Sequence, residues 1–137
     1  REKFFTAYGI KQKEVGERII AKPRTKAYGR LSVLCQYRAS ASLLFDIPRQ
    51  AFIPPPKVTS CIVQIVPQDE KPDAPKQKIL EKLVSAAFNQ RRKMLRASLK
   101  TMGVDPLPKL AAAGIEQTAR AEELSVDDFC RLAKEYE

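Results

Sequence analysis

The segment from Phe52 to Val58 (Phe-Ile-Pro-Pro-Pro-Lys-Val) combines an aromatic ring, three consecutive prolines and a lysine. The prolines hold the backbone extended, so little conformational entropy is lost on binding. An aromatic ring on such a loop can stack on an unstacked nucleobase, which is worth roughly 1–3 kcal/mol, and Lys57 can meet a phosphate. The same residues also fit an ordinary loop with Phe52 in the core, or a proline-rich peptide ligand.

A second candidate is the basic segment of residues 89–100, which contains no acidic side chain. On a helix, Arg92, Arg96 and Lys100 would share one face, where like charges repel by a few tenths of a kcal/mol per pair. Phosphates would relieve this repulsion and release counterions. We therefore expect an RNA-binding face, with a solvated basic helix as the alternative, from five residues: Arg91, Arg92, Lys93, Arg96 and Lys100.

The stretch from Arg18 to Arg38 is a third basic region, with Lys22, Arg24, Lys26 and Arg30 between its ends and no acid. It too can bind phosphates or remain solvated. The acidic pairs Glu122-Glu123 and Asp127-Asp128 fit the beginnings of helices better than acid–base catalysis.

The composition excludes several classes of function. No histidine is present, which excludes a Ser-His-Asp or Cys-His mechanism and a histidine-bound zinc in these residues, and we expect no metal site. The three cysteines are far apart and fit buried thiols. Apolar runs fall short of the roughly 20 residues of a membrane span, and no signal peptide is recognisable, so we expect a soluble, cytoplasmic protein.

Charge is distributed unevenly along the 137 residues, whose net charge is +9. Residues 1–67 hold 12 Lys/Arg and 4 Asp/Glu, whereas residues 104–137 hold 4 Lys/Arg and 8 Asp/Glu. This asymmetry favours a polyanionic partner, although a basic protein without one is possible.

The polar, proline-rich residues 68–75 are predicted to form a linker between two halves. Before it, two strands too few for a complete sheet suggest the end of a larger α/β domain. Helices are predicted there at Lys13–Ala21 and Tyr28–Tyr37, and the second has Leu31, Leu34 and Cys35 on one stripe. A buried strand is predicted at Ala41–Ile47, with an antiparallel partner at Val58–Val66.

After the linker the pattern is helical. One helix is predicted from about Ile79 to Thr101, with Gly103 as its stop. A short helix at Leu107–Ala113 should end at Gly114, and Ser125 should cap a last helix with Val126, Phe129 and Leu132 on its buried side.

Four blocks of sequence, in order and at matching spacing, resemble the KsgA-type ribosomal RNA adenine dimethyltransferases. They are Gln-Lys-Glu-Val-Gly-Glu-Arg (12–18), Tyr-Gly-Arg-Leu-Ser-Val (28–33), Phe-Ile-Pro-Pro-Pro-Lys-Val-Thr-Ser (52–60) and Phe-Asn-Gln-Arg-Arg-Lys-Met-Leu (88–95). The resemblance covers roughly Gln12 to Lys134. Enzymes of this family transfer methyl groups from S-adenosylmethionine to N6 of two adjacent adenosines near the 3′ end of small-subunit rRNA.

The resemblance implies an α/β plus all-α fold: the end of a class I (Rossmann-like) methyltransferase domain over residues 1–67, with 1–11 unmatched, and a helical RNA-positioning domain over 76–137. It implies that Phe52 stacks on the target adenine, and that Lys57 and the basic residues of 89–100 bind rRNA. It also suggests that residues 28–33 pack a helix against the sheet.

Three of the family's motifs do not occur in this sequence: its Gly-rich donor loop, the acidic residue on the ribose and its Asn-Leu-Pro-Tyr loop. We therefore expect S-adenosylmethionine to be bound mainly by residues absent from this chain, which alone should be inactive. The implied partner is small-subunit rRNA in a pre-30S particle, and we expect the protein to bind it as a monomer. The alternatives are a macrolide-resistance-type methyltransferase of large-subunit rRNA and a non-enzymatic RNA-binding or ribosome-assembly module.

Overall fold

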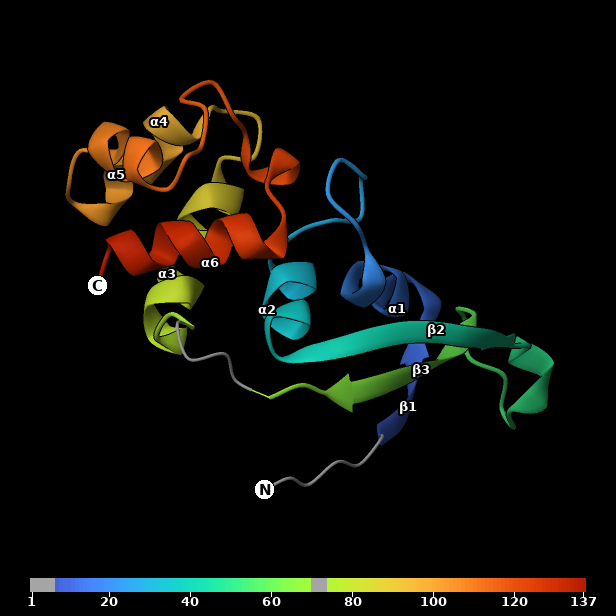
Figure 1. Ribbon diagram of the computed structural model, residues 1–137. Coiled ribbons are helices and arrows are strands. Elements are labelled where there is room, and N and C mark those ends of the chain that lie inside the picture. Colours follow the sequence, from blue (N-terminus) through green and yellow to red (C-terminus); the bar gives the residue numbers. More distant parts are fainter. Residues whose placement is uncertain (1–6, 70–73) are drawn as a thin grey trace.

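A computed structural model describes residues 7–69 and 74–137, in which a small antiparallel sheet lies at one end and a group of helices at the other (Figure 1). The strand order is β1-β3-β2, with β1 at Ala7–Gln12, β2 at Ala39–Ile47 and β3 at Ser60–Pro67. The helices are α1 (Lys13–Ile20), α2 (Arg30–Arg38), α3 (Gln77–Asn89), α4 (Leu95–Ser98), α5 (Pro106–Ala112) and α6 (Val126–Glu135). None of these described helices has the length and apolar character needed to cross a membrane.

The central strand β3 confirms the sequence prediction, since its run of β-branched residues pairs antiparallel with β2. The sequence prediction missed β1, which lies within residues 1–12 and pairs with β3 from Ala7↔Ile65 to Gln12↔Ser60. Gly9 interrupts the β-branched and aromatic character of this strand, and the residues with which the strand pairs are 48 to 58 positions away in the sequence. Gln12 is followed directly by α1, so the chain turns from the sheet edge onto one sheet face.

Helix α1 covers that face through Gly16 and Ile19, which lie against Cys61 and Val63. A Cβ atom added at Gly16 would lie 2.5 Å from the Cys61 sulfur, so only glycine allows this close approach.

The opposite face of the sheet is open among the described residues. Tyr8, Ile10 and Phe45 are 63%, 58% and 59% exposed there. The predicted burial of β2 is therefore wrong for Leu44 and Phe45, because the described helices cover only one face of the sheet.

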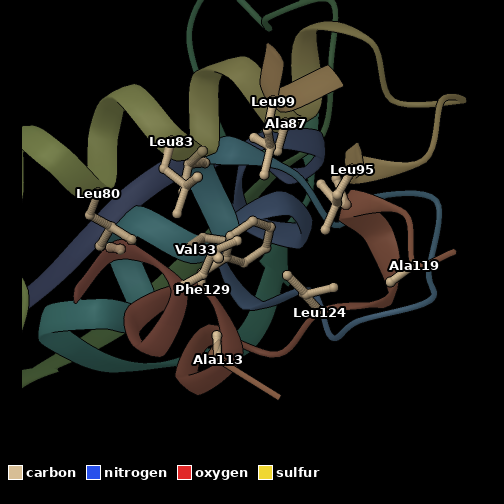
Figure 2. Close-up of a cluster of buried hydrophobic side chains, with 14 of the residues drawn as sticks. Val33, Leu80, Leu83, Ala87, Leu95, Leu99, Ala113, Ala119, Leu124 and Phe129 are labelled. Carbon is tan, nitrogen blue, oxygen red and sulfur yellow. The ribbon is translucent and has the colours of Figure 1, made fainter. Parts of the chain in front are cut away.

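Helix α2 joins the two ends of the molecule. Its buried side is formed by Ser32 and Val33, with Tyr28 just before it, whereas Leu31 of the predicted stripe is exposed. Tyr28 and Val33 enter the large core of the helical part, and Figure 2 shows Val33 beside Phe129 of α6. Within the block of residues 28–33, Tyr28 and Val33 lie in the core shared with α3 and α6, whereas Ser32 Oγ donates to Arg18 O of α1, the helix that covers the sheet. The other large buried side chains of this core are Leu80, Leu83, Val84, Leu95, Leu99, Leu110 and Leu132.

The long helix predicted after the linker is two helices. α3 ends at Asn89, a turn closed by Lys93 N–H to Gln90 O follows, and the chain is then extended at Met94. Met94 pairs with Arg120 in an isolated bridge, and Leu95 N–H donates to Ala119 O at 2.8 Å. These long-range bonds override the local helical preference.

The other helix ends and the cap of the last helix follow the sequence prediction. Gly103 and Gly114 adopt positive φ of 91° and 74° where helical turns end. Ser125 Oγ accepts from Asp128 N–H, and the Asp128 carboxylate accepts from Ser125 N–H, which forms a capping box at the start of α6.

Candidate nucleic-acid interface

The loop between β2 and β3 projects from the end of the sheet that lies away from α3–α6 (Figure 1). A 3₁₀ turn at Arg49–Ala51 opens it, and Phe52 N–H donates to Arg49 O. The Arg49 guanidinium donates to Lys57 O at 3.3 Å across the loop. The loop is therefore a braced structure, as its prolines predict.

The apolar side chains of this loop differ in exposure. Phe52 is half-buried, neither in the core nor fully in solvent, whereas its neighbour Ile53 is 98% exposed. Lys57 is exposed and makes no ion pair with a described residue. Because a wholly exposed isoleucine has no partner in the described chain, the loop tip offers an apolar contact that the sequence did not single out.

The basic segment 89–100 is a turn followed by a short helix, so the predicted alignment of Arg92, Arg96 and Lys100 on one helix face is wrong. Arg92 and Lys93 lie on the turn after α3, Arg96 on α4, and Lys100 on the 3₁₀ turn Leu99–Met102. All four side chains are exposed, and none forms an ion pair with the described part of the chain. Their charge is available to a phosphate partner even though their arrangement is not helical.

Arg91, by contrast, is held in place. Its Nε donates to Glu122 Oε1 at 3.4 Å and its terminal nitrogen donates to Thr25 O at 3.2 Å. The guanidinium carbon lies 5.8 Å from the centre of the Phe88 ring. Phe88 in turn packs edge-on against Tyr28, with ring centres 6.0 Å apart. Arg91 is thus a cation presented at the margin of a rigid aromatic cluster.

A groove of about 460 Å³ runs beside Arg91, between the N-terminal half and α3. Four cationic side chains line it, together with Gly29 and an apolar floor that includes Phe88, Leu31 and Leu34. The cations are Arg18, Lys26, Arg30 and Arg91, and no carboxylate lines the groove. Such a concave basic surface concentrates positive potential and favours an anionic ligand.

The structure brings some of the predicted residues together and separates others. The Arg18–Arg38 region meets Arg91 in the groove, although the two segments are far apart in sequence. The β2–β3 loop, which carries Phe52 and Lys57, lies at the end of the sheet away from α3 and α4 (Figure 1), and none of its residues lines the groove. The candidate interface therefore has two separate parts.

Glu122 and Glu123 have one role that the sequence predicted and a second role that it did not. They lie in the 3₁₀ turn Ala121–Glu123, where Glu123 Oε1 accepts from Arg120 N–H at 2.8 Å, which agrees with the expected role at a helical start. They also pair with Arg91 and Arg24 across the molecule. A pair of acids in a basic chain is the only sequence signal for this second role.

The described residues do not fit the methyl donor that the family uses. Binding of a nucleoside by this kind of fold relies on a glycine-rich turn and an acid that holds the ribose. The groove has one glycine and no lining carboxylate, and the chain's five glycines are isolated. Over residues 7–69 and 74–137, no three His, Cys, Asp or Glu side chains are grouped to hold a metal ion.

Comparison with known proteins places the whole chain in one family. The family model described as "Ribosomal RNA adenine dimethylase" matches residues 3–137, so it also includes most of residues 1–11, which we had expected to depart from the family. "Ribosomal RNA small subunit methyltransferase A" of Xanthobacter autotrophicus is 56% identical over 125 residues, which are 91% of this chain and 43% of that protein. The chain thus spans less than half the length of this relative, and it corresponds to the C-terminal part.

Two solved structures share the fold. A dimethyladenosine transferase from Plasmodium falciparum superimposes with a TM-score of 0.78 at 23% identity, over 93% of this chain and 55% of that one. The 23S rRNA methyltransferase ErmE gives a TM-score of 0.58 at 23% identity, over 95% of this chain and 54% of that one. With the family match over nearly its entire length, this chain belongs to the ribosomal RNA adenine dimethylase family.

Proposed function

We propose that this chain is the RNA-handling part of an enzyme that dimethylates two adjacent adenosines near the 3′ end of small-subunit rRNA. The observation that carries the proposal is the basic groove, with its four cations and no lining acid, in a chain 56% identical to a small-subunit rRNA methyltransferase. Residues 1–67 would complete a class I methyltransferase domain, and residues 76–137 would form a helical RNA-positioning domain joined by 68–75.

The two parts of the interface would have different roles. Phe52 would stack on the target adenine, with Lys57 on an adjacent phosphate. The exposed side chains of Arg92, Lys93, Arg96 and Lys100, together with Arg91 in the groove, would bind the rRNA backbone and fix its register without reading its sequence. The separation of the two parts fits an RNA that is held at one place and modified at another.

The methyl donor, S-adenosylmethionine, would be held mainly by residues outside this chain, since the described residues form no site with a glycine-rich turn and an acid for the ribose. When bound, the donor supplies the methyl group, and the residues of this chain orient the base and the RNA. The protein would act as a cytoplasmic monomer on a pre-30S particle.

The proposal is tested with the complete protein that carries this chain and with radiolabelled S-adenosylmethionine. We expect label in small ribosomal subunits that lack the modification, and none in large subunits or in subunits already modified. Label that appears only in large-subunit rRNA would refute the proposal.

The second candidate is methylation of large-subunit rRNA, and the observation in its favour is the structural similarity to ErmE. That similarity is weaker than the similarity to the dimethyladenosine transferase, with TM-scores of 0.58 and 0.78. The same labelling experiment distinguishes the two, because each candidate predicts a different labelled subunit.

A further inference from the structure

We propose that Glu122 and Glu123 are positioning residues of the basic groove, holding Arg91 and the turn around Arg24 in the arrangement that receives an RNA phosphate. The inference rests on the proposed function of the groove and assigns it two acidic residues. Acids beside an RNA site normally weaken binding by repulsion, so a favourable role has to come from the contacts that they make.

The first contacts are those to Arg91. Its guanidinium is fixed on one side by Glu122 Oε1 at 3.4 Å and on another by Thr25 O at 3.2 Å. Free arginine side chains lose considerable rotamer entropy when they bind a ligand. An arginine already held against Phe88 and between two acceptors has lost much of this freedom before the RNA arrives.

The second set of contacts holds the turn that carries Lys26. Arg24 N–H donates to Glu122 O at 2.7 Å, and the Arg24 guanidinium donates to Glu123 Oε2 at 3.3 Å. Arg24 has φ of 71°, a left-handed conformation that is uncommon for a residue other than glycine. Such strained residues persist where the surrounding contacts fix them, and they are often found at functional sites. Here the fixing contacts come from the acidic pair.

Neither glutamate lines the groove, so both act from outside it: Glu122 directly on the groove residue Arg91, and Glu123 through Arg24, two residues before the groove residue Lys26. Glu122 holds Arg91 through its side chain and Arg24 through its backbone, and Glu123 holds Arg24. The resulting surface presents Lys26, on a turn whose position is set before binding, together with Arg91 and with Arg30 at the start of α2.

The test uses the complete protein and a fluorescent 3′ fragment of small-subunit rRNA, with affinity measured by anisotropy. Glu122→Ala removes the acceptor of Arg91, and we expect it to weaken binding about three- to tenfold, as for the loss of one ordered phosphate contact. Glu122→Gln keeps an acceptor oxygen and should bind at least as well as the wild type. Glu116→Ala is the matched control, since it makes the same charge change at an exposed acid outside the groove, and it should not weaken binding.

A charge exchange supplies a second test. Glu123→Arg places two arginines together and removes the acceptor of Arg120 N–H, so it should weaken binding, and combining it with Arg24→Glu should recover the part of the affinity that depends on the Arg24–Glu123 pair. Equal or tighter binding by Glu122→Ala, at unchanged melting temperature, would overturn the inference while the proposed function stands, because simple repulsion predicts that sign. A wild-type protein that shows no salt-dependent binding to this RNA would overturn both.

Discussion

Tyr28 offers the sharpest test of how the N-terminal half is attached to the helical core. Its side chain is fully buried, and its hydroxyl donates to Leu124 O at 2.7 Å. Tyr28→Phe keeps the ring and its edge-on contact with Phe88 but removes the donor. Removing one partner of a buried hydrogen bond costs about 1–3 kcal/mol. For a chain of this length, we expect the melting temperature to fall by roughly 3–10 °C.

The assay is thermal unfolding followed by circular dichroism, with Tyr8→Phe as the matched control. Tyr8 is 63% exposed and its hydroxyl accepts from Gln64 at 3.4 Å, so this change should alter the free energy of unfolding by about 0.5 kcal/mol or less. If the two variants melt at the same temperature, the buried hydrogen bond does not contribute to stability as we reason.

The same residue predicts a pH dependence. Burial raises the pKa of Tyr28 well above its ordinary value of about 10. The folded state therefore keeps this proton at pH values where the unfolded state loses it, and the stabilisation is complete below pH 10 and declines above it. The stability difference between wild type and Tyr28→Phe should shrink as pH rises from 10 to 11. A constant difference over that range would contradict the burial of the hydroxyl.

Three further predictions concern the two parts of the interface and the sheet. Phe52→Ala in the complete protein should lower the rate of methyl transfer about tenfold or more and RNA affinity much less, because a stacking contact of roughly 1–3 kcal/mol acts on the extruded base. The measurement is steady-state methylation, and an unchanged turnover rate would rule out stacking by Phe52. Replacing Arg92 and Arg96 with Ala should flatten the salt dependence of RNA binding by about one counterion per lost contact, and an unaltered slope would mark both as solvated. Gly16→Val should lower the free energy of unfolding by about 1–3 kcal/mol, since the added Cβ would lie 2.5 Å from the Cys61 sulfur. Denaturant titration measures this free energy, and an unchanged value would mean that α1 can move aside.

The elements that the sequence predicted well are those with strong local signals. β3 contains consecutive β-branched residues, and α6 is capped by Ser125, with Asp128 positioned to complete the capping box. The break after Asn89 could not be predicted in the same way, because residues 89–100 have no proline or glycine to end a helix. It is imposed by the bridge between Met94 and Arg120, which forms only in the folded chain.

The candidate site shows the same division between local and long-range information. The basic residues and the rigid loop of Phe52 could be recognised from residue types and their resemblance to a family. The grouping of Arg91 with Lys26 and Arg30 could not, because it depends on how α3 packs on the N-terminal half. For the same reason, Glu122 could be assigned to a helical turn but not to Arg91.

The course of the chain connects the two parts of the candidate interface, which under the proposed function would act on one RNA. Arg30 stands at the start of α2 beside the groove, α2 continues directly into β2 at Ala39, and β2 leads to the loop of Phe52. No flexible connection interrupts this path, and Tyr28 and Val33 anchor its start in the helical core. β2 alone has nine residues, a length of about 30 Å by the rise of a strand. Groove and loop are therefore the ends of one continuous segment, and under the proposed function an RNA held at the groove would present only nucleotides about this far away to the loop.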